Sequence, residues 1–279
     1  MNRPHSPALD AILGNQFPVL DHGFIRVIDY MGDDAAIEEA ARMSYANGTR
    51  KVSETRDLLR YLMRHRHSTP YEMCEIKWHI RLPIFVARQW VRHRTANINE
   101  QSARYSEMRE EFYIPRPEQL AKQSETNKQG RGEVLSAENA ASVLRMLYAD
   151  ARRSHDDYKD MMHTHGLSRE VARISLPLGT YTEWVWKIDL HNLFHFLALR
   201  ADQHAQWEIR QYAETMLDIV RQWVPIATEA WEDYRLNAVS LSAQALAVMK
   251  RRLAGEVVTL EGSGMGRREW MEFVGEFGG

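Results

Sequence analysis

The segment Cys74–Leu82, CEIKWHIRL, alternates strictly between apolar and polar side chains. Because successive residues of a β-strand point to opposite faces of a sheet, the alternation predicts a strand with one buried face. Pro83 follows directly and begins the helix-like segment PIFVARQWVRHR. A proline is tolerated in the first helical turn, since its missing N–H would have no partner there. The chain is therefore expected to change from strand to helix at Pro83.

Strands and helices are both predicted along the rest of the chain. The segments FIRVIDYMG (24–32) and YTEWVWKI (181–188) have the composition of strands. Apolar residues at helical spacing predict long helices over 137–165 and 189–224. Since strands and helices do not alternate as β-α-β units, and no linker divides the chain, we expect an α+β fold in a single domain.

The catalytic domain is expected to span residues 23–238. Residues 1–22 lack the apolar core of a secretory signal and are interpreted as a leader that is either mobile or an oligomer arm. Residues 239–279 are interpreted as a C-terminal helical extension of unassigned role. The polar, aromatic-free segment Glu118–Glu133 is predicted to be a surface excursion, and whether it acts as a lid is left open.

Composition limits the classes of partner. The 36 Lys and Arg residues nearly balance the 38 Asp and Glu residues, giving a net charge of −2. The overall charge therefore indicates no nucleic-acid partner. The apolar runs are far shorter than the roughly 18 residues of a membrane span, so no membrane partner is expected. Cys74 is the single cysteine, which fits a reducing, cytoplasmic setting.

The segment Arg92–Tyr105, RHRTANINEQSARY, concentrates cationic and hydrogen-bonding side chains. A basic last turn of a helix would explain Arg92, His93 and Arg94, but it would not explain the next ten residues, seven of which are polar. Arginine donors match two phosphate oxygens, and a glutamate can accept hydrogen bonds from sugar hydroxyls or a base N–H. The residue types suit a nucleotide about as well as they suit a solvated basic face.

Two alternatives use other features. His191 and His195 are four residues apart and share a helix face, a spacing that permits a metal, but no HExxH motif is present and no metal is expected. A metal hydrolase that uses these two histidines, and a non-catalytic nucleotide-binding or RNA-binding module that uses the basic segment, are the alternatives to an enzyme acting on a nucleotide. The common nucleotide fingerprints, G-x-G-x-x-G and the P-loop, are also absent.

Several segments of the sequence also resemble those of a known enzyme family. The segment RHRTANINEQSARY resembles the signature R-H-R-x-x-S-x-N-E-x-S-x-R of the flavin-dependent thymidylate synthases. Further segments resemble blocks of the same family in the same order: HRHSTPYE, LPIFVARQWVRHR, EFYIPRPE, SREVARISLPLGTYTEW and NLFHFLALRADQHAQWEIRQYA. Together these blocks cover most of Phe24–Pro225.

The resemblance implies a fold, a reaction and an assembly. It implies an antiparallel-type sheet flanked by long helices, in a homotetramer whose sites are shared between subunits. It also implies a methyltransferase that converts dUMP to dTMP. The methylene would come from 5,10-methylenetetrahydrofolate, and FAD reduced by NADPH would supply the hydride.

The resemblance also implies roles for individual residues. Those assigned to dUMP are Gln89, Arg92, Glu100, Ser102, Ala103, Arg104, Arg173 and Arg200. Those assigned to FAD are Ser44, His67, Thr69, Glu72, Arg92, His93, Arg94, Asp189, His191 and His195. Arg200, Ser102 and Arg104 are assigned to catalysis, with Arg200 on the uracil carbonyl and Arg173 reaching dUMP from a neighbouring subunit. Ser102 is interpreted as a phosphate ligand, since no general base adjoins it in sequence.

Three positions depart from the family pattern. Asn97 stands where the signature has serine, and Asp189 and His195 stand where the family often has asparagine. Asp189 is also a plausible N-cap of the helix that follows it. Cys74, on the apolar face of the predicted strand, is expected to be an inert buried thiol, which favours a reaction without a cysteine nucleophile.

Overall fold

A computed structural model describes residues 4–43, 54–125 and 130–278. The chain divides into two compact units, Met1–Trp231 and Glu232–Gly279.

The centre of the larger unit is a five-stranded sheet in the order β1-β2-β3-β7-β4. Its strands are β1 (Phe17–Val19), β2 (Gly23–Met31), β3 (Glu75–Pro83), β7 (Tyr181–Asp189) and β4 (Asn97–Glu100). Every neighbouring pair is antiparallel. The predicted α+β fold with an antiparallel sheet is therefore confirmed for this unit.

The strand predicted from alternation is β3, the middle strand of the sheet. Its residues Ile76, Trp78, Ile80 and Leu82 are all fully buried, as is Cys74 just before it. Trp78 lies opposite Trp186 of β7, so large side chains face each other on the covered side of the sheet. The hydrophobic effect of burying these side chains fixes which face of β3 meets the core.

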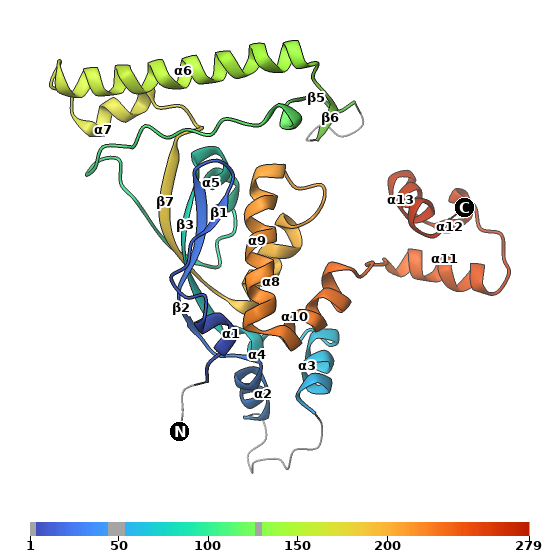
Figure 1. The fold of residues 1–279 in the computed structure, drawn as a ribbon. Helices are drawn as coiled ribbons and strands as arrows, with labels where there is room; N and C mark the ends of the chain where they lie inside the picture. Colours follow the sequence, from blue (N-terminus) through green and yellow to red (C-terminus); the bar gives the residue numbers. More distant parts are fainter. Residues whose placement is uncertain (1–3, 44–53, 126–129, 279) are drawn as a thin grey trace. The chain divides into compact units, whose positions relative to one another are not determined.

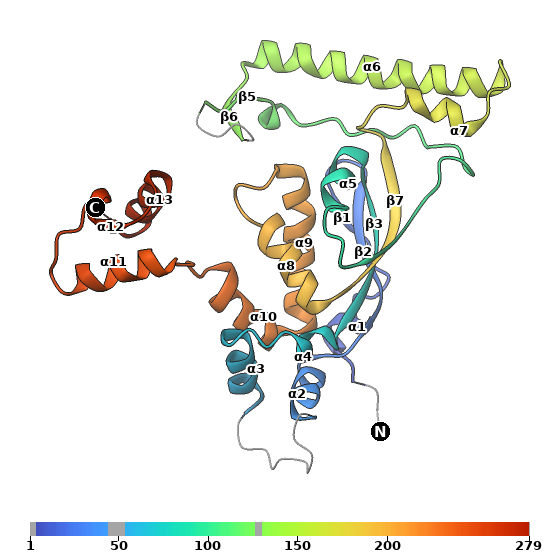
Figure 2. The same ribbon diagram turned by 180° about the vertical axis from the view of Figure 1, so that it is seen from behind.

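The remaining elements of the larger unit connect and cover the sheet. They are α1 (Pro7–Asp10), α2 (Asp34–Arg42), α3 (Thr55–Arg64), α4 (Thr69–Glu72), α5 (Ile84–Trp90), η1 (Pro117–Gln119), β5 (Ala121–Gln123), β6 (Arg131–Val134), α6 (Ala137–His163), α7 (Arg169–Ala172), η2 (Arg173–Ser175), α8 (Leu190–Arg200), α9 (Trp207–Trp223) and α10 (Pro225–Trp231). Helices α8 and α9 lie beside the sheet, and α9 packs on β1 and β2 (Figure 1). Figure 2 shows α7 alongside the long helix α6, with which it is in contact.

The predicted continuous helix over 189–224 is wrong in one place. The chain leaves the helix at Ala201 and re-enters it at Trp207. The carboxylate of Asp202 accepts hydrogen bonds from the backbone N–H and the ring Nδ1 of His204, at 2.7 and 2.9 Å. Short polar side chains that bond to nearby backbone groups favour turns over helix, which explains the break.

The segment interpreted as a leader contains α1 and β1. Leu9 is fully buried, and the backbone N–H of Ser6 donates to the hydroxyl of Tyr30 at 2.8 Å. Likewise, the segment predicted as a surface excursion contains β5 and β6, which pair as a two-stranded sheet. Both segments therefore form structure within the larger unit.

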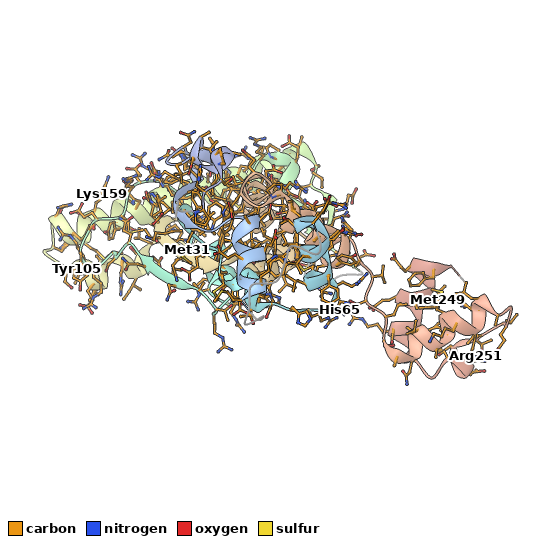
Figure 3. The ribbon with its side chains drawn as sticks, turned by 90° about the horizontal axis from the view of Figure 1, so that it is seen from below. Met31, His65, Tyr105, Lys159, Met249 and Arg251 are labelled. Atoms are coloured by element: carbon orange, nitrogen blue, oxygen red, sulfur yellow. The ribbon has the colours of Figure 1, made fainter. Side chains whose placement is uncertain are left out.

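The smaller unit has its own core. It contains η3 (Glu232–Leu236), α11 (Ala243–Leu253), α12 (Leu260–Ser263) and α13 (Arg267–Phe277). Its buried side chains include Val248, Met265 and Phe273, with Met249 of α11, labelled in Figure 3, packed against them. In the described parts of the chain, no helix combines the length and apolar character that a membrane crossing requires.

Candidate active site

A guanidinium and an imidazole meet where α5 and α8 end. Arg200 is the last residue of α8, and its Nε donates to Nε2 of His93 at 3.0 Å. The backbone N–H of His93 in turn donates to the carbonyl of Trp90, the last residue of α5, at 2.9 Å. Since the Nε2 atom of His93 accepts a hydrogen bond, the ring is neutral and carries its proton on Nδ1. The two helix ends thus hold Arg200 in a fixed orientation.

The electrostatics of this pair agree with its geometry. Burial, followed by the nearby charges of Arg200 and His195, lowers the pKa of His93 to about 4. Burial also lowers the pKa of Arg200, although an arginine stays protonated at neutral pH. The pair therefore presents one positive charge, partly removed from water, beside a neutral hydrogen-bonding ring. Partial burial strengthens the interaction of that charge with any anionic group placed against it.

The predicted flavin residues come from three segments of the larger unit. Thr69 and Glu72 lie on α4, which packs against α8. The rings of His93 and His195 lie 6.0 Å apart in an edge-on arrangement, so the turn after α5 meets α8. His67 stacks on Tyr61 at 6.1 Å, at the end of α3. The structure thus brings His93 and His195 together.

Other predicted flavin residues lie in different settings. Arg92 and Arg94 are exposed, and neither side chain forms an ion pair or hydrogen bond with the residues that the structure describes. Asp189 caps α8: its carboxylate accepts from the backbone N–H and the side-chain amide of Asn192, at 2.9 and 2.7 Å. The predicted N-cap is therefore confirmed. His191 is exposed on α8, and Ser44 lies outside the described residues.

A second cluster contains three of the predicted dUMP residues. Oγ of Ser102 accepts from the backbone N–H of Arg104 at 3.2 Å. The Arg104 side chain reaches Oε2 of Glu170 at 3.4 Å, and Nε of Arg173 donates to the carbonyl of Glu170 at 3.2 Å. The Glu170 carboxylate contacts Arg104 and its backbone carbonyl contacts Arg173, so both arginines lie next to one residue.

Neighbouring contacts hold this loop in position. Ala103 packs against the buried cluster of Met108, Tyr158 and Ala172, which ties the loop to α6 and α7. Oε1 of Glu100 accepts from the Thr182 hydroxyl at 2.7 Å, so the end of β4 is fixed to β7. Tyr105, at the end of the motif and labelled in Figure 3, is 78% exposed.

The structure also reveals a polar network that sequence reasoning did not assign. The side-chain amide of Gln89 donates to Oε1 of Gln206, and Nε2 of Gln206 donates to Oε2 of Glu208 at 2.8 Å. Glu208 is only 2% exposed, although it lies in the first turn of α9. The sequence gives little indication that Glu208 is buried. An acidic residue near the start of a helix is normally exposed to water and stabilises the helix by interacting with its dipole.

No cluster of three or more potential metal-ligating side chains occurs among the residues that the structure describes. His191 and His195 share the α8 helix, but neither has a third ligand of this kind there. The geometry therefore gives the metal-hydrolase alternative no observation in its favour.

The low pKa of His93 leads to a prediction about acid stability. Between about pH 6.5 and pH 4 the unfolded chain binds a proton that the folded ring does not, so stability is lost as the pH falls through this window. We expect His93 to contribute a loss of about 1 kcal/mol between pH 7 and pH 5, after discounting for solvent screening. His93→Gln should show a smaller loss, measured as the free energy of unfolding in urea at both pH values. An equal pH dependence in the variant and the parent would contradict the assignment.

Fold and site together define a class of protein. A mixed sheet-and-helix unit that carries clustered arginines, together with an arginine at a helix end that a neutral histidine holds, is typical of an enzyme that binds anionic ligands. Residues 26–226 match the family described as "Thymidylate synthase complementing protein". The chain belongs to this family, the flavin-dependent thymidylate synthases, which are methyltransferases.

Individual relatives are similar over nearly the whole chain. The flavin-dependent thymidylate synthase of Ruegeria pomeroyi is 61% identical over 271 residues, covering 96% of this chain and 90% of the relative. The protein of the same name from Gluconobacter oxydans is 58% identical over 275 residues, covering 98% and 91%. A crystal structure of the UMP/dUMP methylase PolB from Streptomyces cacaoi, bound with 5-Br UMP, is 32% identical with a TM-score of 0.71. That match covers 78% of this chain and 97% of the methylase.

Proposed function

We propose that this protein converts dUMP to dTMP, taking a methylene from 5,10-methylenetetrahydrofolate and using FAD and NADPH for the reduction. The observation that carries the proposal is the half-buried Arg200 guanidinium, held by the neutral His93 ring at 3.0 Å. Family membership supplies the class of reaction. The methylase from Streptomyces cacaoi, which binds 5-bromo nucleotides in crystals, supports a pyrimidine nucleotide as the substrate.

We assign the phosphate of dUMP to the cluster around Glu170. The Ser102 hydroxyl and the guanidinium groups of Arg104 and Arg173 are the donors there. A dianionic phosphate would compete with the Glu170 carboxylate for Arg104, and at 3.4 Å in an exposed setting that ion pair is weak. Glu100 would accept from the sugar, and Gln89 and Arg92 would complete the nucleotide contacts. Arg173 is proposed to serve a neighbouring subunit as well as this cluster.

The residues present fit a flavin dinucleotide. Arg92 and Arg94 offer exposed guanidinium groups that are not paired with any described residue, and such donors suit a pyrophosphate without a glycine-rich loop. The rings of His93 and His195, with Thr69 and Glu72 of α4, supply hydrogen-bonding groups for the rest of the cofactor. When bound, the flavin supplies the hydride that this reaction needs.

Arg200 would be the main residue that stabilises negative charge during the reaction. Hydride addition places negative charge on the pyrimidine, and the guanidinium stabilises that charge more in the transition state than in the ground state. His93 fixes the orientation of Arg200 and, being neutral, adds no competing charge. Cys74 is excluded as a nucleophile because it is fully buried, and burial raises the pKa of its thiol to about 12.

We also propose a homotetramer with sites shared between subunits. Helix α6 is 27 residues long, yet only Ala140, Ala151, His155 and Tyr158 are buried in the protomer. Met146, Leu147 and Tyr148 of the same helix are exposed and large, which suits a surface covered by another copy. Light scattering of the purified protein would measure the assembly.

The central experiment combines a spectrum with a turnover assay. The purified protein, supplied with FAD, should show a flavin absorbance that stays with the protein on gel filtration. With NADPH, methylenetetrahydrofolate and dUMP it should form dTMP, which chromatography detects. Protein that retains no FAD, or that oxidises NADPH without forming dTMP, would contradict the proposal.

Arg104→Ala tests the phosphate assignment. We expect the KM for dUMP to rise about 30- to 100-fold, because a charge-assisted hydrogen bond to phosphate is lost, while FAD affinity changes little. Glu170→Gln is the matched control: it removes the carboxylate that competes for Arg104, so the KM for dUMP should stay equal or fall. Steady-state kinetics at varied dUMP would measure both. An unchanged KM in Arg104→Ala would move the phosphate elsewhere.

A further inference from the structure

A separate cavity of about 770 Å³ is lined by residues of η1, strands β5 and β6 and the start of α9. Its volume is within the usual range of small-molecule sites. Its walls carry three arginines, Arg116, Arg131 and Arg210, and the aromatic side chain of Trp207. None of these residues was assigned to dUMP or FAD, and the role of the cavity is therefore open.

The arginines give the cavity an excess of positive charge. Arg131 is paired with the buried Glu208 at 2.5 Å. Arg210 donates from Nη1 to the carbonyl of Gln203 at 3.0 Å, and its Nε lies 3.4 Å from the half-exposed Glu214. Arg116 forms no ion pair with the residues that the structure describes. Glu118 is the single acidic side chain among the lining residues. An anionic ligand would thus find two guanidinium groups whose charge is not fully compensated.

The cavity wall is connected to the proposed dUMP site by hydrogen bonds. Glu208 accepts from Arg131 on the cavity side, and from Nε2 of Gln206 at 2.8 Å. Oε1 of Gln206 accepts from Gln89, which is assigned to dUMP. Because Gln206 also lines the cavity, a ligand in the cavity and a nucleotide at Gln89 would both be close to this one side chain. This places the cavity where a second substrate of the same reaction could extend.

We propose that this cavity binds the anionic end of a co-substrate of the proposed reaction, through Arg116 and Arg210, with Trp207 against its apolar part. The inference rests on the proposed function, since both co-substrates named there end in oxyanions. The shared chemistry is an oxyanion that accepts two N–H donors from a guanidinium. Its source is either the γ-glutamyl carboxylates of the folate tail or a phosphate of NADPH.

The test uses the double variant Arg116→Ala/Arg210→Ala in the full-length holoenzyme. We measure the KM for methylenetetrahydrofolate carrying one or five glutamates, and the KM for NADPH and for NADH. The double variant should raise one co-substrate KM about tenfold or more, because two charge-assisted contacts are removed. If the folate tail is the ligand, the variant loses the advantage of five glutamates over one. If NADPH is the ligand, the variant loses the preference for NADPH over NADH.

A matched control and a binding measurement make the result decisive. Arg268→Ala removes an arginine that is 94% exposed in the smaller unit and should leave every constant unchanged. Equal constants in the parent and the double variant, within about twofold, would overturn the proposal. Calorimetry with tetrahydrofolate pentaglutamate and with NADPH separates this outcome from a failure of the proposed function. If the parent forms no dTMP but the double variant still binds either probe more weakly, the cavity assignment stands and the proposed reaction fails.

Discussion

Arg200→Ala is expected to lower kcat for dTMP formation by about 100- to 1,000-fold. Removing one preorganised donor from a developing charge typically has an effect of this size. Arg200 is half-buried and fixed by His93, so no reorganisation is needed when the charge appears. Initial rates at saturating dUMP would measure kcat, and bound-flavin absorbance would check that the cofactor site is intact.

Two control variants separate charge from position. Arg200→Lys keeps a positive charge but loses the planar fork and the Nε donor to His93, so it should recover only part of the rate. Arg268→Ala should have the rate of the parent. A kcat within about threefold of the parent in Arg200→Ala would show that this guanidinium does not act on the reacting ring.

Trp90→Ala is expected to lower the free energy of unfolding by about 3–5 kcal/mol. Trp90 is fully buried among Trp184, Trp186, Phe196 and Tyr212, with ring centroids 4.5 to 6.0 Å away. Alanine would leave a cavity at the junction of α5, α8, α9 and the sheet. The carbonyl of Trp90 also accepts from the His93 backbone, so a shift of α5 would disturb the Arg200–His93 pair. Urea unfolding followed by circular dichroism measures the change.

Trp90→Phe is the matched control. The indole N–H of Trp90 has no hydrogen-bond partner among the described residues, so phenylalanine removes volume without removing a hydrogen bond. We expect a loss of about 1–2 kcal/mol, since part of the aromatic contact remains. Equal losses in the two variants would show that the indole volume is not what stabilises this junction.

The sequence predicted the central strand and which of its side chains are buried. Strict alternation over Cys74–Leu82 leaves only one way to bury Ile76, Trp78 and Ile80 together, since a strand has a side-chain period of two. The helix break at Ala201 was not predicted, because apolar spacing continues across it. The helix ends there because the Asp202 carboxylate accepts two hydrogen bonds from His204. Such bonds leave no mark in the spacing of apolar residues, which was the pattern used to predict the helix.

The sequence also predicted part of the candidate site. The three arginines and one histidine of Arg92–Tyr105 were compatible with an anionic ligand or with a solvated basic face, and the family resemblance favoured the ligand. The sequence could not show that His93 is neutral. Its pKa depends on burial and on Arg200, which lies 107 residues further along the chain.

The sequence by itself determined the alternating strand, the type of fold and the chemical character of the site, since these depend on side-chain types and on local spacing. Only the tertiary structure decided which distant residues meet. It placed Arg200 on His93, Arg104 and Arg173 on Glu170, and Gln89 on Gln206. The physical reason is that hydrogen bonds and pKa values depend on distances of a few ångströms and on burial, and both are set by how the helices and strands pack.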